Sequence, residues 1–149
     1  LKDSFYFNSN DETAPFGNTI GKKAWEDFYE WRQLNNGKPA ITFLKNKIES
    51  ADFSGENPED PAPAPLQAFL MQHEYGSRML YETDALVIAI SFAQLYLEGR
   101  IDSDVKAMAI AAIKRESSAL LLVNWGEPVA TERKKKLELM LHNMETMKD

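Results

Sequence analysis

The sequence predicts an all-α protein, a single-domain bundle of about six helices over residues 1–149, packed around a buried central helix and carrying an irregular N-terminal arm. Residues 85–97 form an apolar run that only Ser91 and Gln94 interrupt. A helix that is apolar on nearly every face is usually buried on nearly every face. Elsewhere apolar residues recur at spacings of three and four, which is the helical period. The chain has the length of one ordinary domain.

Residues 1–18 are rich in Asn, Asp, Ser, Pro and Gly, a composition that indicates turns and therefore the irregular arm. Phe5, Tyr6 and Phe7 add either a short edge strand or an arm packed on the helices.

Asn18 or Thr19 can cap a first helix that runs to about Leu34, because both side chains accept hydrogen bonds from free backbone N–H groups. Residues 35–37 read Asn-Asn-Gly and end it, since these residues tolerate the left-handed conformation. One face of this helix carries Ala24, Trp25, Phe28, Tyr29 and Arg32, with Trp31 toward its side. A second helix begins near Pro39, a residue suited to a first turn, and ends near Ser50.

Residues 52–65 contain four prolines and four acidic side chains, which predicts an exposed connector without regular structure. Pro65 can open a third helix from Leu66 to about Tyr75, followed by a kink at Gly76.

The central helix should continue to Glu98 and stop at Gly99, and we expect four of its residues to be almost fully buried: Leu86, Ile90, Ala93 and Leu97. Asp102 or Ser103 caps the next helix, which ends at residues 117–118. Residues 119–125 form a short apolar turn or helix. Thr131 caps the last helix, which presents Leu137, Met140, Leu141 and Met144 to the core and residues 133–136, Arg-Lys-Lys-Lys, to water.

Composition excludes several classes of site. The chain has no Cys, which rules out disulfides, thiolate metal sites and a cysteine nucleophile. The formal net charge is −6, and residues 1–74 carry 12 acidic against 7 basic side chains. This sign opposes non-specific nucleic-acid binding and fits either a basic protein partner or solubility. The run 85–97 is shorter than the ~20 residues that cross a bilayer, so we expect no membrane insertion.

Three segments resemble one family. Residues 7–14 (FNSNDETA) look like a Phe-x-Asn-Asp-x-x-Ala stretch, residues 95–113 (LYLEGRIDSDVKAMAIAAI) are similar to a Leu-Gly-Arg-Leu-Asp-x-x-Val signature, and residues 123–141 hold a Trp-containing turn before a basic helix. Together they resemble the DUF4259-like family of small bacterial domains of unknown function. The family's Trp-Gly-x-Gly opening is absent here. The resemblance implies a helical fold and a bacterial protein, and it implies no activity. The absence of Cys fits a reducing compartment, so we expect a cytoplasmic protein. The chain begins at Leu1, which leaves N-terminal processing open.

Candidate sites with catalytic or metal-binding chemistry are few. Glu98, Asp102 and Asp104 lie close together in sequence and could offer oxygen ligands to a cation. The spacing lacks the ligand count of a calcium loop, and acids at a helix start also favour its dipole. His73 has no partner at helical metal-binding spacing. We therefore expect no cofactor, no metal and no catalytic residue.

The sequence favours a non-enzymatic, acidic helical protein that binds a protein partner, such as a bacterial immunity or inhibitor protein that neutralises a basic toxin. Acids around an aromatic anchor match the anatomy of an interface. Two alternatives stay open: a metal-dependent enzyme with an acidic site at Asp11, Glu12 and Glu26 or at the Asp102 loop, and a structural homo-oligomer. The predicted partner-binding residues are Asp11, Glu12, Glu26, Asp27, Glu30 and Trp31.

Overall fold

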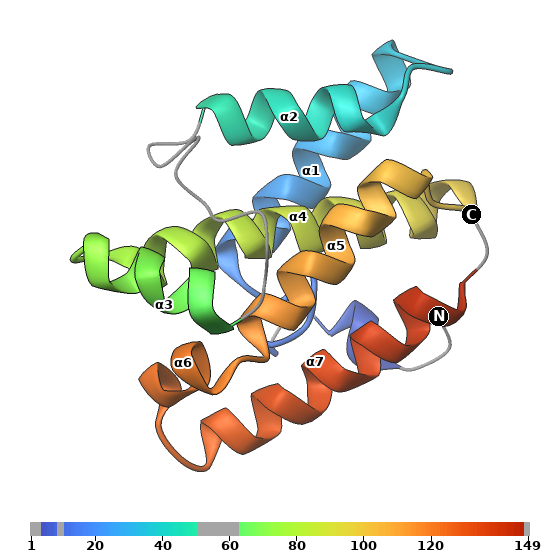
Figure 1. The fold of residues 1–149 in the computed structure, drawn as a ribbon. Helices are drawn as coiled ribbons and strands as arrows, with labels where there is room; N and C mark the ends of the chain where they lie inside the picture. The colour runs from blue at the N-terminus through green and yellow to red at the C-terminus, as the bar shows by residue number, and fades with distance from the viewer. Residues whose placement is uncertain (1–3, 9–10, 51–62, 148–149) are drawn as a thin grey trace.

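The computed structural model describes residues 4–8, 11–50 and 63–147, and over these ranges it confirms the all-α prediction. No strand occurs among the described residues, and the helices pack around one central element, α4 (Figure 1). In chain order the elements are η1 (Ser4–Phe7), α1 (Thr19–Leu34), α2 (Ala40–Ser50), α3 (Pro63–Gln72), α4 (Gly76–Glu98), α5 (Ser103–Glu116), α6 (Ala119–Leu122), η2 (Val123–Trp125) and α7 (Val129–Thr146).

The predicted connector falls mostly on residues 51–62, which lie outside the described part of the chain. Its last residues contradict the prediction of irregular structure, because α3 begins at Pro63. Proline is tolerated in the first turn of a helix, where its missing N–H would have had no partner. Both Pro63 and Pro65 sit in that turn.

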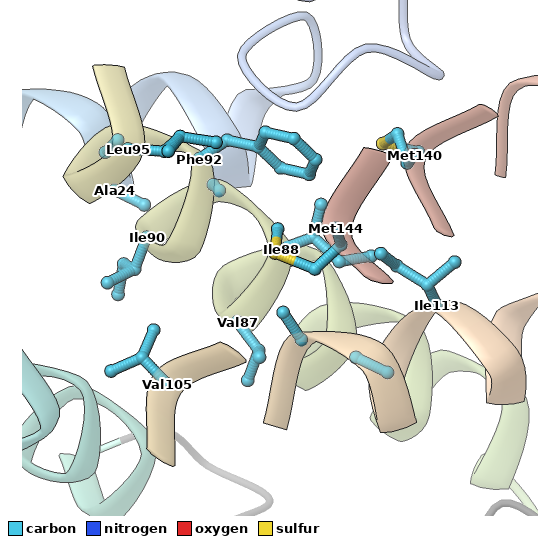
Figure 2. Packing of buried hydrophobic residues seen from close by; sticks show 14 of the residues in the cluster. Ala24, Val87, Ile88, Ile90, Phe92, Leu95, Val105, Ile113, Met140 and Met144 are labelled. Carbon is cyan, nitrogen blue, oxygen red and sulfur yellow. The ribbon is translucent and has the colours of Figure 1, made fainter. Parts of the chain in front are cut away.

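Helix α4 packs chiefly against α1 and α5, and α7 packs against α5 on the side away from α2 (Figure 1). Figure 2 shows Ile88 of α4, Ile113 of α5 and Met144 of α7 meeting where these helices converge. Of the four α4 residues predicted to be fully buried, Ile90 and Ala93 are completely buried. Leu86 and Leu97 are half-buried, because they pack against the core from its edge.

By length and composition α4 could cross a membrane, because the whole 23-residue helix is apolar enough. The apolar run 85–97, on which the prediction of no membrane insertion was based, is only part of this helix. In the structure 72% of the most apolar 18-residue window is buried inside the protein, as in the core helix of a soluble protein.

The N-terminal segment packs on the helices and, in its described part, forms a 3₁₀ turn. Phe5 and Tyr6 are buried, and the Tyr6 ring lies 5.1 Å from that of Phe92 on α4. The Tyr6 hydroxyl accepts a hydrogen bond from the Asn143 side chain of α7. The arm therefore closes the core between α4 and α7.

Helix boundaries follow the predicted signals at several points. The Asn18 side chain accepts a hydrogen bond from Gly21 N at 2.7 Å and so caps α1. Gly99 ends α4 in the left-handed conformation, with a φ of 70°. Helix α7 begins at Val129, two residues before the predicted cap Thr131, whose hydroxyl donates to the Glu127 carboxylate instead.

Of the two predicted caps, Asp102 and Ser103, Asp102 holds the N-cap position of α5, but the expected side-chain capping bond is absent. Its Oδ2 accepts from the backbone N–H of Ala40, the first residue of α2, at 3.3 Å. Its own N–H donates to Gln94 Oε1 of α4 at 3.1 Å. Asp102 thus joins three helices, a role that depends on how they pack and that local sequence does not encode.

Candidate binding surfaces

The structure separates the six residues predicted to bind a partner. Glu26 and Glu30 are exposed on α1, and Glu12 is exposed on the turn that precedes it. Asp11 is half-buried and accepts hydrogen bonds from both the backbone N–H and the hydroxyl of Thr13. Asp11 therefore organises its own turn, whereas the other three present their carboxylates to solvent.

Asp27 is held within the fold. It forms ion pairs with Lys23 at 2.9 Å on α1 and with Lys47 at 2.7 Å on α2. Burial alone would raise the pKa of Asp27, but the hydrogen bonds from the two ammonium groups outweigh it and the pKa is lowered. Its charge is thus paired with Lys23 and Lys47 and is less available to a partner than the charges of Glu26 and Glu30.

Trp31 is not the exposed aromatic anchor of the predicted interface, although it lies to the side of the apolar face of α1. It is half-buried, and its ring stacks on Phe28 with centroids 5.9 Å apart and approaches Phe43 of α2 at 5.3 Å. The Arg32 guanidinium lies 5.0 Å from the ring centroid. Trp31 therefore packs between α1 and α2. Helical periodicity alone does not show that α2 covers this side of α1.

A different group of aromatic side chains reaches solvent. Trp25 of α1 contacts Phe16, Tyr29 and Tyr96, with ring centroids 5.3, 5.9 and 5.3 Å away. Tyr29 is 45% exposed and Tyr96 is 53% exposed. We call Phe16, Trp25, Tyr29 and Tyr96 the aromatic patch. Sequence reasoning missed Tyr96 because it treated the whole run 85–97 as buried.

Acidic side chains border the aromatic patch. Glu26 and Glu30 each follow one of its α1 aromatics by a single residue, and the exposed basic residues on the same helix are Lys22 and Lys23, of which Lys23 is paired with Asp27. At one end of the patch the Arg32 guanidinium pairs with Glu98 of α4 at 2.7 Å. The arrangement joins exposed aromatic area to a predominantly acidic edge.

A second feature is a buried charge network between α4, α5 and α7. Asp84 is completely buried, and Arg115 Nε and Nη2 donate to its two carboxylate oxygens at 3.0 and 2.7 Å. Next to Arg115, the buried Glu116 accepts from Arg133 Nη2 at 3.3 Å. Paired charges of this kind are the form in which ionic groups are tolerated inside proteins.

The prediction that Arg133 faces water with its lysine neighbours is therefore wrong. Arg133 is 5% exposed, and its guanidinium lies 4.3 Å from the Trp125 ring and 5.5 Å from the Tyr81 ring. Its planar group donates to one oxygen of the Glu116 carboxyl group and also lies against aromatic rings, a combination that suits a guanidinium better than an ammonium. Lys134 and Lys135 are exposed, as predicted, whereas Lys136 is half-buried and its ammonium lies 4.8 Å from the centroid of the Phe5 ring.

The two carboxyl groups of the network differ in their tendency to ionise. Burial raises the pKa of Asp84, although the hydrogen bonds from Arg115 oppose this effect. Burial and then the neighbouring Asp84 carboxylate raise the pKa of Glu116 well above its ordinary value. Glu116 Oε2 accepts no hydrogen bond from any described donor. A proton retained on Glu116 and shared with Asp84 lowers the repulsion between the two groups.

Glu116 also lines a cleft of about 340 Å³. Its walls come from α4, α6 and η2, in addition to the end of α5, and the other lining residues are Ser77, Arg78, Tyr81, Leu121, Asn124 and Trp125. Two of them join the rim across the cleft, because the Asn124 amide donates to the Ser77 hydroxyl at 2.9 Å. Burial raises the pKa of Tyr81, and the nearby Arg133 partly offsets the increase.

Neither acidic group considered for metal binding forms a recognisable cation site. Within residues 4–8, 11–50 and 63–147, no three His, Cys, Asp or Glu side chains converge in a way that could hold a metal ion. Asp102 is engaged by Arg100, Gln94 and Ala40. Asp104 accepts from the N–H of Val105 at the start of α5.

Comparison of the chain with protein-family models, with curated proteins and with solved structures found no match. The resemblance to the DUF4259-like family thus stays a prediction from the three sequence segments.

Proposed function

We propose that this protein acts by binding a basic protein partner, as a bacterial immunity or inhibitor protein of the cytoplasm does, and that the aromatic patch on α1 and α4 is the contact surface. The observation that carries the proposal is the exposure of Tyr29 and Tyr96 in direct contact with Trp25. Aromatic side chains supply most of the binding free energy at many interfaces, where they are surrounded by a polar rim.

Charge selects the partner in this proposal. Glu26 and Glu30 border the patch, and residues 1–74 hold most of the acidic excess of the chain. Complementary charge accelerates encounter and orients the partner, whereas desolvated aromatic contacts set the lifetime of the complex. The partner should therefore present a basic surface around an apolar pocket.

The first experiment identifies the partner and locates the interface together. The protein is used as bait in host lysate beside two variants, Tyr29→Ala/Tyr96→Ala and the control Tyr75→Ala, which removes an exposed tyrosine outside the patch. We expect one basic protein to be retained by the native protein and the control and lost from the double variant. Equal retention by all three would place the interface elsewhere.

Kinetics with the purified partner then separate the two contributions. Reversing Glu26 and Glu30 to Lys should slow association about tenfold or more at low salt and weaken its salt dependence, because rim charges act on encounter. Tyr29→Ala/Tyr96→Ala should instead accelerate dissociation. Sedimentation of the protein alone tests the competing explanation, which is self-association through the aromatic patch. A dimer that dissociates in the tyrosine variant would assign the patch to self-association and contradict the proposal.

A further inference from the structure

Contacts between a cation and an aromatic ring recur within this fold. The basic side chains that lie over rings in the described part of the chain are Arg32, Lys47, Arg133 and Lys136. The face of an aromatic ring attracts a cation within about 6 Å of its centroid. Arg32 and Arg133 also pair with carboxyl groups, those of Glu98 and Glu116, at 2.7 and 3.3 Å. A guanidinium placed between a ring and a carboxyl group is therefore an arrangement that the protein already uses.

The α1 rings of the aromatic patch have no such cation from within the protein. No basic side chain in the described part of the chain lies over the ring of Trp25 or of Tyr29. Trp25 meets Tyr29 at an interplanar angle of 41° and Tyr96 at 65°, so the ring faces point in different directions. Tyr29 is 45% exposed, and its ring can therefore be reached by a cation from outside the chain.

Carboxyl groups stand beside these rings. Glu26 and Tyr29 are three positions apart on α1, a spacing that makes them neighbours on the helix surface. Glu30 lies one turn beyond Glu26, and both acids are exposed. Lys22 is also exposed on this helix, but the two acids exceed its charge. A cation over the rings would thus be attracted by the ring faces and by the carboxylates, whereas an anion would be repelled by both.

We infer that the aromatic patch receives an arginine side chain of the protein partner, whose guanidinium lies over the rings of Trp25 and Tyr29 and pairs with Glu26. This inference rests on the proposed function and names the chemistry by which its contact surface recognises the partner. Arginine suits the patch better than lysine, because a guanidinium is planar and weakly hydrated and can stack on a ring while its N–H groups donate to a carboxylate.

Three peptides of equal length test the inference on the native protein before any partner is known. One carries arginines separated by glycines, the second carries lysines at the same positions, and the third carries citrullines, which have the size of arginine but no charge. We expect the arginine peptide to bind about tenfold more tightly than the citrulline peptide and several-fold more tightly than the lysine peptide. Binding should also shift the NMR signal of the indole N–H of Trp25. Equal affinity for the arginine and citrulline peptides, or an unmoved Trp25 signal, would overturn the inference.

One variant and a matched control locate the arginine. Tyr29→Leu keeps apolar area but removes a ring, so the preference for the arginine peptide over the lysine peptide should disappear. Tyr75→Leu makes the same change at an exposed tyrosine outside the patch and should leave the preference intact. Far-UV circular dichroism confirms that both variants fold. A preference for arginine that survives Tyr29→Leu would refute the site, and if that variant does not fold, the three peptides on the native protein decide.

The outcomes separate this inference from the proposed function. Suppose that the partner is captured through Tyr29 and Tyr96 but the native protein binds the arginine and citrulline peptides equally. The patch then docks apolar groups alone, so the arginine inference fails while the proposed function stands. If instead the peptides bind in the expected order but no protein from the lysate depends on the two tyrosines, the preference for guanidinium groups is supported and the proposed function fails.

Discussion

Removing one member of the Asp84–Arg115 pair should be among the most damaging single changes in the described part of this protein. Asp84 is completely buried, and Arg115 donates to both of its carboxylate oxygens. Arg115→Met preserves most of the apolar stem but leaves a buried carboxylate without its main partner. Breaking a buried ion pair in this way costs about 3–5 kcal/mol. For a domain of this length that corresponds to a melting temperature lower by roughly 6–20 °C.

A double-mutant cycle measured by urea unfolding tests this reasoning. Asp84→Leu/Arg115→Met removes both charges, and such replacements are often neutral or stabilising, so the double variant should be more stable than either single variant. The deficit of Arg115→Met should also shrink as the pH falls, because protonation of Asp84 removes the uncompensated charge. Should Arg115→Met be too unstable to purify, Arg115→Lys provides a milder step. Single-variant losses below about 1 kcal/mol, or losses that simply add in the double variant, would refute the assignment of a strongly coupled buried pair.

Three further predictions concern separate features. The pKa of Glu116 is raised in the folded protein, so the stability that this group contributes is complete below the ordinary carboxyl pKa and is lost as the pH rises through its folded-state pKa. Glu116→Gln should reduce this loss of stability at higher pH, which urea midpoints measured across a pH series would show. The same pH dependence in the variant and the native protein would contradict the prediction. Asp102→Ala should lower the free energy of unfolding by about 0.5–2 kcal/mol, because the N–H of Ala40 loses its acceptor. Burial would raise the pKa of Asp102, but its hydrogen bonds outweigh this effect and lower it. The difference in stability between the variant and the native protein, measured by thermal unfolding, should therefore vanish as the pH falls through the pKa of Asp102. Gly17→Ala would place its Cβ 1.7 Å from the backbone oxygen of Asp11 and should cost at least about 1–3 kcal/mol, so a melting temperature equal to native would mean that the turn rearranges freely.

The sequence predicted the fold because its main signals are local. The Asn18 cap, the Gly99 stop and the apolar run in α4 each depend on residues within one or two turns, and all three are present in the structure. The boundary errors at α3 and α7 amount to two or three residues, which is the usual uncertainty of helix ends.

The charge network could not be predicted because its pairs join separate helices. Arg115 and Asp84 are 31 positions apart, and Arg133 and Glu116 are 17 apart. Helical periodicity identifies the apolar face of a helix, but it does not show which charged residue beside that face is buried. Arg133 stands in a run of four basic residues, where a solvated face is the usual interpretation. A usable signal was the position of Asp84 directly before the most apolar run of the chain.

Dependence on tertiary packing also explains why only some of the predicted partner-binding residues are exposed. Glu26 and Glu30 could be placed on the outer side of α1 from its helical period, whereas the fate of Trp31 depended on where α2 folds back. Tyr96 reaches solvent within a helix that is otherwise largely buried, so its exposure depends on the tertiary packing around that position.

The packing of Tyr6 also has a consequence for folding of the chain during its synthesis on the ribosome. Its ring rests against α4 and its hydroxyl is held by Asn143, which lies 137 residues later in the chain. Residues of α7 leave the ribosomal exit tunnel after all the helices that precede them, so this contact cannot form until α7 has been synthesised. Until then Phe5 and Tyr6 lack the contacts that α7 provides, and a nascent chain stalled before α7 would keep them in that state. Synthesis of α7 is therefore the event that completes the burial of this N-terminal segment.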